Sequence, residues 1–209
     1  VWAWSKFLDR IKDEYGHRKA VLLMHTDPFD TEGPNLLALR DHFGLRDNIV
    51  FSTERVGFDQ LNEYYNLSDF TINTSHSEGF GLSTLESMMT GTPIIAPMTG
   101  GQTRQVVDYR TGSQNGIALP IEFQTMVGNQ TVPYILEDYT SVETITDALY
   151  DMYHIKQLPR GYKALCDKAK SYANFEFNYE SRITQWDSLI TDTIQSWKSR
   201  YNRYKMEVM

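Results

Sequence analysis

Apolar residues along the chain follow two alternating patterns. In some stretches they recur every three or four residues, which is typical of a helix that buries one face. In others they form short, nearly continuous runs, which are typical of strands buried on both faces of a sheet. The predicted helices cover residues 2–15, 34–43, 58–67, 83–90, 102–108, 141–153, 158–173 and 178–204. The predicted strands cover residues 20–24, 49–51, 70–73, 94–96 and 116–119.

This alternation predicts an α/β fold with a Rossmann-like, doubly wound parallel sheet and additional helices at the C-terminal end. Ligands of such sheets bind beyond the carboxyl ends of the strands. The loops that begin at His25, Ser52, Ser75 and Pro97 are therefore expected to converge on one crevice. The polar stretch 121–139 is expected to be an irregular insertion.

Length and composition indicate a globular chain with one main domain. The chain has 209 residues, of which 41% are hydrophobic and 22% charged, as in ordinary folded domains. We expect one domain over residues 1–177 and a long helix over 178–209. Trp186 and Trp197 on that helix either pack across an interface with another domain or anchor the helix to this one.

The charge and cysteine content limit the function classes. A net charge of −7 argues against a nucleic-acid-binding surface. The chain has no apolar run long enough to predict a transmembrane segment. The single cysteine, Cys166, excludes an internal disulfide and favours a reducing compartment, so the expected location is cytoplasmic.

The stretch from Ser75 to Glu86 carries the strongest candidate chemistry. A glycine-containing loop separates two carboxylates, Glu78 and Glu86, and leads from a predicted strand into a predicted helix. A helix N-terminus after such a loop favours anions. Two other interpretations remain open, because Ser83-x-x-Glu86 also fits a helix capping box and Glu78 also fits a solvated loop acid. Gly79 and Gly81 also fit a turn that needs positive φ.

The wider sequence around this stretch resembles a known family. Residues 77–97, SEGFGLSTLESMMTGTPIIAP, resemble the donor-binding signature of the retaining GT-B glycosyltransferases, in particular family 4. Residues 67–75 resemble the strand that leads into that signature, and Gly100-Gly101 matches the glycine pair that follows it. The resemblance extends over residues 20 to about 155 and weakens at 121–139.

The resemblance implies a nucleotide-sugar site. It places Glu78 beside the donor sugar as the candidate catalytic residue, and it places Glu86 on the ribose hydroxyls. It implies that backbone amides of the glycine loop meet the sugar or the diphosphate, and that the segment after the second strand borders the nucleobase. The implied donor-binding residues are Gly79, Phe80, Gly81, Leu82, Glu86, Thr53 and Val56; His25, His76, Gly100 and Gly101 are further candidates.

The implied reaction is hexosyl transfer with retention at the anomeric carbon. The donor is a UDP- or GDP-linked sugar, the acceptor is a glycan, lipid or protein, and no cofactor is expected. Electrostatic stabilisation of the departing diphosphate is the main catalytic demand. The chain has no Asp-x-Asp sequence and no metal-ligand spacing, so no metal is expected.

The chain departs from the family at its start. The family's first strand, its basic Arg/Lys pair and its N-terminal acceptor domain have no counterpart here. We therefore expect a C-terminal, donor-binding half that transfers little sugar alone and reaches a membrane, if at all, peripherally through the missing half. Arg55 and Arg104 are alternative cations, against an ordinary surface or structural role. The alternative functions are a GT-B-fold nucleotide-sugar epimerase or hydrolase, and a non-catalytic nucleotide-sugar-binding module.

Overall fold

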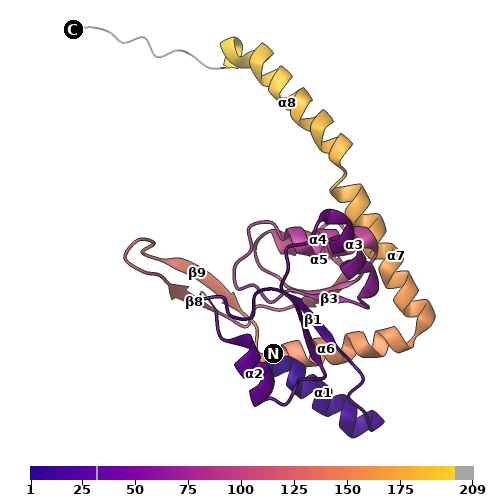
Figure 1. The fold of residues 1–209 in the computed structure, drawn as a ribbon. Coiled ribbons are helices and arrows are strands. Elements are labelled where there is room, and N and C mark those ends of the chain that lie inside the picture. The colour runs from indigo at the N-terminus through magenta and orange to yellow at the C-terminus, as the bar shows by residue number, and fades with distance from the viewer. Residues whose placement is uncertain (32, 201–209) are drawn as a thin grey trace.

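The computed structural model describes residues 1–31 and 33–200 and has parallel strands at its centre with helices around them (Figure 1). The helices are α1 (Trp2–Tyr15), α2 (Leu36–His42), α3 (Phe58–Leu67), α4 (Leu82–Thr90), the 3-10 helix η1 (Gly100–Gln102), α5 (Thr103–Val106), α6 (Val142–Gln157), α7 (Pro159–Glu176) and α8 (Tyr179–Arg200). The strands are β1 (Leu22–His25), β2 (Ile49–Ser52), β3 (Thr71–Ile72), β4 (Ile94–Pro97), β5 (Val107–Asp108), β6 (Ser113–Gln114), β7 (Gly116–Leu119), β8 (Phe123–Val127) and β9 (Ile135–Tyr139).

Local sequence signals explain where several helices begin and end. Gly16 and Gly91 follow α1 and α4 in the left-handed conformation, which lacks a steric cost only for glycine. The Ser141 side chain accepts a hydrogen bond from the Thr144 amide at the start of α6, which is the N-cap arrangement. The predicted helix ends at these positions are confirmed.

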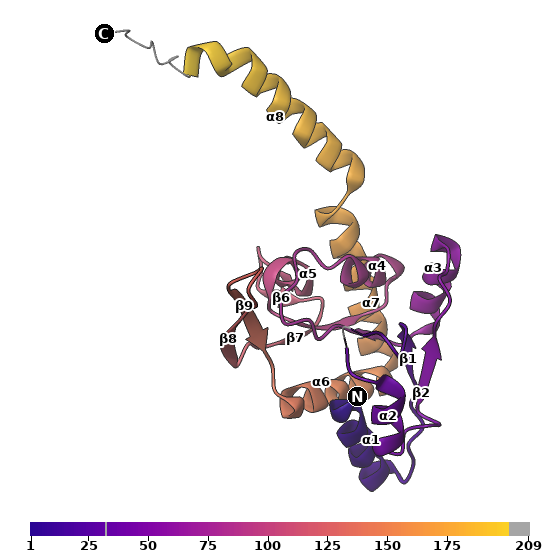
Figure 2. The ribbon, with the colours of Figure 1, turned by 60° about the vertical axis from the view of Figure 1, so that its left-hand side comes forward.

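The parallel strands form two separate pieces (Figure 2). In one piece β1 pairs with β2, and in the other the order is β3-β4-β7. Within the described residues no strand pairing joins β1 to β3. The parallel strands and their alternation with helices confirm the predicted fold class, whereas the continuous sheet that the alternation suggested is interrupted at this point.

The strand β4 shows that helices cover both faces of the larger piece. All of its residues are buried. Ile95 belongs to the apolar cluster that contains α1 and α6, whereas Ile94 and Ala96 belong to the cluster that contains α4 and α7. Because successive strand side chains point to opposite faces, this division means that one helix pair covers each face, as in a doubly wound fold.

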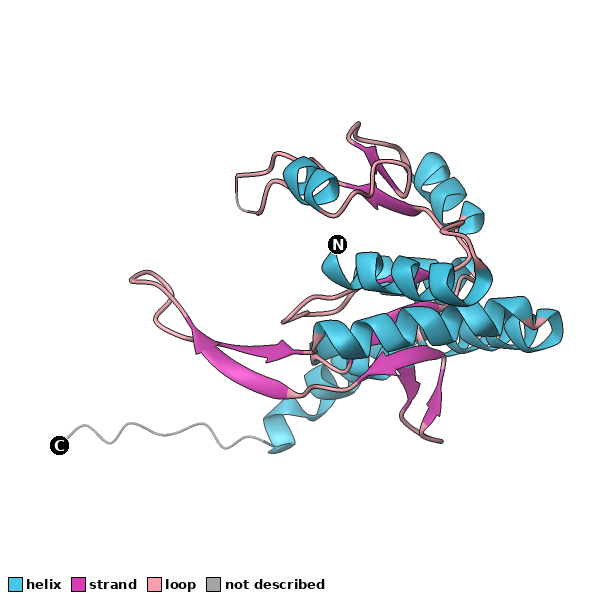
Figure 3. Cartoon of the chain, turned by 90° about the horizontal axis from the view of Figure 1, so that it is seen from below, coloured by secondary structure: helices cyan, strands magenta, loops and turns pink. Residues whose placement is uncertain are grey.

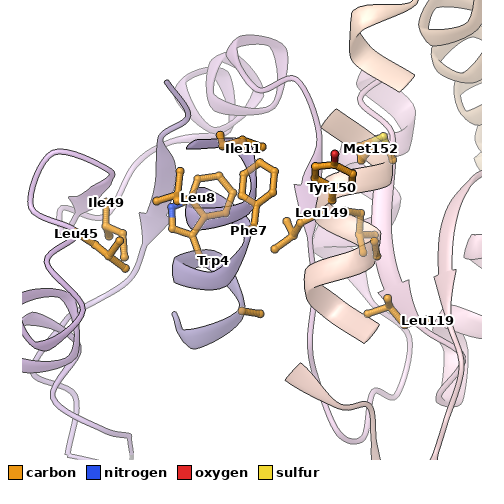
Figure 4. Packing of buried hydrophobic residues seen from close by; sticks show 13 residues of the cluster. Trp4, Phe7, Leu8, Ile11, Leu45, Ile49, Leu119, Leu149, Tyr150 and Met152 are labelled. Atoms are coloured by element: carbon orange, nitrogen blue, oxygen red, sulfur yellow. The ribbon is translucent and has the colours of Figure 1, made fainter. Parts of the chain in front are cut away.

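Helix α1 connects the two strand pieces through side chains. Trp4 and Leu8 point toward Leu45, before β2, and Ile49, the first residue of β2 (Figure 4). Phe7 points toward Leu149 on α6 (Figure 4). The Trp4 indole also donates a hydrogen bond of 3.2 Å to the main-chain oxygen of Asn48. A single apolar cluster thus spans both pieces, and the packing of α1 sets their relative position.

A cavity of about 1770 Å³ lies between the two pieces. Residues 20–26, which contain β1, and residues 68–74, which contain β3, both line it. The only strand partner of β1 is β2, and that of β3 is β4, among the residues that the structure describes. Each strand therefore presents one unpaired edge, and both strands lie along the same cavity, which Val1 and Trp2 also line.

The sequence suggested that the stretch 121–139 is irregular, and this expectation is wrong. It contains an antiparallel hairpin, β8 and β9, that projects from the body of the molecule (Figures 1 and 3). The hairpin pairs five residues of each strand in register, from Phe123↔Tyr139 to Val127↔Ile135. The expectation failed because Gly128 and Pro133 lie in the connection between the strands, where turn residues belong, rather than within them.

Helix α8 extends away from the rest of the chain (Figures 1 and 2). The side chains of Trp186 and Trp197 are 63% and 53% exposed, so the interpretation that they anchor the helix to this domain's core is wrong. The predicted helix extends to residue 204, and its last four positions lie outside the described residues. Among the described helices, none has both the length and the apolarity needed to cross a bilayer.

Phe7→Ala tests the role of α1 as the connection between the pieces. Phe7 is 1% exposed, and its truncation removes packing and leaves a cavity. We expect the free energy of unfolding to fall by about 3–5 kcal/mol, measured by denaturant unfolding. Lys12→Ala, on the exposed side of the same helix, is the control and should change it by less than about 0.5 kcal/mol. Similar losses for the two variants would contradict this role.

Candidate functional site

The loop before α4 has the geometry of an anion-binding turn. Gly81 adopts φ 87° and is the N-cap of α4, and no side chain caps the helix. Ser83 therefore lies inside the helix, one residue after its first position, and the capping-box interpretation of Ser83 and Glu86 is wrong. The first amides of α4 are left for another acceptor, which is the arrangement that favours an anion at a helix N-terminus.

Glu78 folds back over this turn. Its carboxylate Oε1 accepts a hydrogen bond of 3.1 Å from the Gly81 amide and lies 3.4 Å from the Phe80 amide nitrogen. The side chain is half-buried. The acid is thus fixed by the same amides that the resemblance assigns to the donor, and a ligand gains those amides only when Glu78 turns away.

The loop that follows β4 packs directly against the glycine turn. The Gly101 amide donates a hydrogen bond of 3.0 Å to the Glu78 carbonyl. A Cβ atom at Gly100, where φ is +48°, would overlap that carbonyl, and one at Gly101 would lie 2.6 Å from the Phe80 Cα. The two loops therefore meet backbone to backbone, and only glycine fits at both positions.

Glu86 faces away from the helix start, toward α3. Its Oε2 accepts a hydrogen bond of 2.9 Å from the Tyr65 hydroxyl. Burial, together with the hydrogen bond and charge of Glu86, raises the pKa of Tyr65 well above its ordinary value. Tyr65 therefore stays a neutral donor, and it holds one oxygen of a half-buried carboxylate in a fixed position.

Helix α3 brings the other candidates close to Glu86. Tyr64, the neighbour of Tyr65, lies 3.0 Å from the Ser52 hydroxyl, and Ser52 lies 3.0 Å from Nδ1 of His25. The ends of β1 and β2 are therefore linked to α4 through two adjacent tyrosines. Thr53 is exposed and Val56 half-buried in the loop between Ser52 and α3.

His76 faces the β8–β9 hairpin. Its ring lies 4.0 Å, centroid to centroid, from Tyr139, and its Nδ1 is 3.6 Å from Glu137 Oε2. These contacts connect the loop before Glu78 with the base of the hairpin. The role of His76 as a further candidate for the donor site stays a prediction.

The site contains carboxylates and no cation of its own. Residues 75–86 and 97–103 include no Lys or Arg. Arg104 forms an ion pair with Glu176 on α7 and lies over the Tyr109 ring, which is a structural arrangement, whereas Arg55 is exposed. Among residues 1–31 and 33–200 no cluster of three or more His, Cys, Asp or Glu side chains could hold a metal ion.

Several residues at the site were not predicted from the sequence. Gln105 is fully buried, and its Nε2 donates a hydrogen bond of 2.6 Å to the Phe80 carbonyl. Gln102, also fully buried, donates to the Thr84 hydroxyl at 3.3 Å. The two glutamines follow the glycine pair and are three residues apart, as on one face of a helix. This spacing is a weak signal, and it points to the site only when the contact between the two loops is known. Tyr65 carried no such signal.

Gly100→Ala tests the backbone contact between the two loops. The new Cβ would overlap the Glu78 carbonyl in a left-handed backbone conformation, so the loops must separate. We expect a loss of about 2–4 kcal/mol in the free energy of unfolding, measured by denaturant titration. Gly79→Ala is the control, because its Cβ would meet nothing within 4 Å. Equal effects of the two substitutions would show that the contact is unimportant.

Comparisons with known proteins show what this chain is similar to. Residues 31–121, from before α2 to just after β7, match the model of the family described as glycosyl transferases group 1. Over 82 residues, the chain is 42% identical to the D-inositol 3-phosphate glycosyltransferase of Acidothermus cellulolyticus. That match covers 39% of this chain and 18% of that protein, so the chain spans less than a fifth of its relative's length.

Solved structures share the fold. Sucrose-phosphate synthase from Thermosynechococcus elongatus superimposes with a TM-score of 0.63 at 20% identity, over 93% of this chain and 43% of that one. The C-terminal domain of a group 1 family glycosyl transferase from Francisella tularensis gives 0.58 at 16% identity, over 85% of this chain and 79% of that domain. The chain therefore has the Rossmann-like fold of one half of a GT-B enzyme, and its residues 31–121 are similar to group 1 glycosyl transferases.

Proposed function

We propose that this chain is the donor-binding half of a retaining glycosyltransferase and binds a nucleoside-diphosphate sugar. The observation that carries the proposal is the pair of fixed carboxylates, Glu78 and Glu86, on either side of the uncapped N-terminus of α4. A diphosphate, a ribose and a sugar require an anion site and two hydroxyl acceptors, which is what this arrangement offers.

The diphosphate would bind at the start of α4. The helix dipole favours negative charge there, and no side chain caps the helix. Binding would release the Gly81 amide from Glu78 and turn the Glu78 carboxylate toward the donor sugar. Glu78 is therefore the proposed catalytic residue, with the amides of Phe80, Gly81 and Leu82 as ligands of the sugar or diphosphate.

The nucleoside would lie toward α3. Glu86 has one oxygen held by Tyr65, and its other oxygen is proposed to accept hydrogen bonds from the ribose hydroxyls. The loop with Thr53 and Val56 would border the base, which is supported by the link from Ser52 through Tyr64 to α3. His25, at 3.0 Å from Ser52, lies on the same side.

The proposed reaction is hexosyl transfer with retention, through an oxocarbenium-like transition state. Its main requirement is stabilisation of the negative charge that develops on the leaving diphosphate. The helix N-terminus meets part of it, and basic side chains from residues on the N-terminal side of Val1 would meet the rest. We propose no metal and no cofactor in this step.

The proposal includes an acceptor-binding domain outside this chain, which would bind a glycan, lipid or protein. It also includes a strand that precedes α1 and fills the cavity between β1 and β3. A strand followed by α1 and then β1 would form a right-handed crossover unit, and its first strand would lie parallel to β1. The unpaired edges of β1 and β3 and the position of Val1 on the cavity support this arrangement.

The proposal also concerns the isolated chain, the surroundings of α8 and the location of the protein. Without the basic side chains and the acceptor domain, it should bind nucleotide but transfer little or no sugar. The exposed apolar residues of α8, which include Trp186 and Trp197, are consistent with a further domain beside it. A reducing, cytoplasmic location is part of the proposal and is supported by the single free cysteine, Cys166.

Calorimetric titration with UDP and with GDP tests the nucleotide site. We expect one of the two to bind, and Glu86→Ala to weaken binding by roughly tenfold to a hundredfold, because hydrogen bonds to a charged group contribute about 1.5–3 kcal/mol. Tyr65→Phe, which leaves Glu86 without its fixed donor, should have a smaller effect in the same direction.

Glu63→Ala is the matched control for this experiment, because Glu63 is an exposed carboxylate on α3 two residues from Tyr65. Its affinity for nucleotide should equal that of the natural chain. If neither nucleotide binds the natural chain, the proposed function is wrong. If Glu63→Ala and Glu86→Ala weaken binding equally, the assignment of Glu86 to the ribose is wrong.

Addition of a strand before Val1 tests the proposed use of the cavity. A fusion variant with six alternating Val and Ile residues and a short Asn-Gly loop should pair with the free edges of β1 and β3. We expect the melting temperature to rise by about 4 °C or more, since 1 kcal/mol corresponds to about 2–4 °C at this chain length. Amide exchange in β1 and β3 should slow.

The control fusion has the same length but carries Gly and Ser in place of Val and Ile. Such a segment has little tendency to form a strand and no apolar side chains to bury, so it should leave melting and exchange unchanged. If both fusions behave alike, an added strand does not occupy the cavity.

A further inference from the structure

The β8–β9 hairpin contacts the candidate site through its base. Its outer part projects from the body (Figures 1 and 3), with Met126 and Tyr134 more than half exposed. Its last residues, Glu137 to Tyr139, lie against the loop that carries Glu78. The base of the hairpin is therefore the part able to influence the site.

Asp138 makes three hydrogen bonds there. Its backbone amide donates to the His76 carbonyl at 2.8 Å. Its carboxylate accepts from the Thr99 hydroxyl at 2.5 Å and from the Gln124 side chain at 2.6 Å. Asp138 is thus bonded at once to the loop before Glu78, to the loop after β4 and to the neighbouring strand of the hairpin.

These two loops are the ones that meet where Gly100 and Gly101 pack against the backbone of Glu78 and Phe80. His76 lies two residues before Glu78, and Thr99 directly precedes Gly100, whose backbone packs against the Glu78 carbonyl. The hydrogen bond from Gly101 to Glu78 joins the loops on one side. Asp138 joins them at a second place, so each loop is held at two points.

Other contacts at the hairpin base support the same arrangement. The Tyr139 ring lies between those of His76 and Phe123, at centroid distances of 4.0 and 5.0 Å. The hydrogen bonds from Thr99 and Gln124 lower the pKa of Asp138, so its carboxylate stays charged at neutral pH. A charged acceptor makes stronger hydrogen bonds than a neutral one.

We propose that Asp138 is a positioning residue that fixes the loop of Ser75–Glu78 against the loop of Thr99–Gly101 and thereby places Glu78 for the donor. The part of this proposal that concerns the donor rests on the proposed function. The part that concerns the two loops rests on the hydrogen bonds alone. The proposal gives the hairpin, which lies where the family resemblance is weakest, a direct effect on the site.

Hydrogen exchange of the full 209-residue chain without ligand tests the effect on the loops. Asp138→Ala removes the acceptor, and Thr99→Val removes the donor while the hairpin stays intact. Both should speed amide exchange in residues 76–81 and 99–102 by roughly tenfold or more, the effect expected for loss of a hydrogen bond to a carboxylate. The double variant should be little worse than either single variant, because both remove the same bond.

Glu122→Ala is the matched control. Glu122 is also a carboxylate at the hairpin base with three hydrogen bonds, but its donors are Ser141 and Thr144 at the start of α6. This variant should lower stability and leave exchange in the two loops unchanged. If it loosens the loops as much as Asp138→Ala does, or if neither Asp138→Ala nor Thr99→Val loosens them, the proposal is overturned.

Titration of the same variants with UDP and GDP separates this proposal from the proposed function. Asp138→Ala and Thr99→Val should each lower the affinity for the nucleotide that the natural chain binds by roughly tenfold. Glu122→Ala should leave that affinity unchanged. If amide exchange in the loops becomes faster but the affinity for nucleotide stays unchanged, the proposal that Asp138 places Glu78 is overturned. If the natural chain binds neither nucleotide, the proposed function fails, and loosened loops would still support the connection that Asp138 makes.

Discussion

The packing of α1 is the interaction on which the rest of the structure depends. Within the described residues, the two parallel strand pieces share no strand pairing, so hydrogen bonds of a continuous sheet do not hold them together. One apolar cluster does so instead: side chains of α1 pack against Leu45 and Ile49 on one side and against Leu149 on the other. The candidate site extends over both pieces, since His25 and Ser52 belong to one and Glu78 and Glu86 to the other. The site is therefore only as well defined as this core.

Around the glycine turn, the main chain does most of the positioning. The loops after β3 and β4 meet through Gly100 and Gly101 with no room for a side chain. Glu78 is oriented by the Gly81 amide. Backbone groups are more rigid than long side chains, so a site formed in this way loses little conformational entropy when a ligand binds. Side chains add to this positioning, because the Tyr65 hydroxyl fixes one oxygen of Glu86 and the Asp138 carboxylate holds the Thr99 hydroxyl.

The sequence predicted those features that depend on local physics. The apolar spacing of α1 and the glycines after α1 and α4 gave correct helices because burial and left-handed φ act within a few residues. The sequence did not predict features that depend on contacts between residues far apart in the chain. Ser83-x-x-Glu86 fits a capping box locally, and only the start of the helix at Leu82 excludes it. Tyr65 lies 21 residues from Glu86, and the pairing of Asp138 with Thr99 spans 39, so no local pattern reveals either contact.

The loops of the candidate site carry carboxylates but no basic side chains. Glu78, Glu86, Glu137 and Asp138 are gathered near a position suited to an anion, and residues 75–86 and 97–103 include no Lys or Arg. A helix N-terminus offers only about half a positive charge, which is less than a diphosphate with two or more negative charges requires. The carboxylates suit the hydroxyl groups of a sugar and a ribose instead. Neutralisation of an anion bound at the start of α4 would therefore come from cations outside these loops.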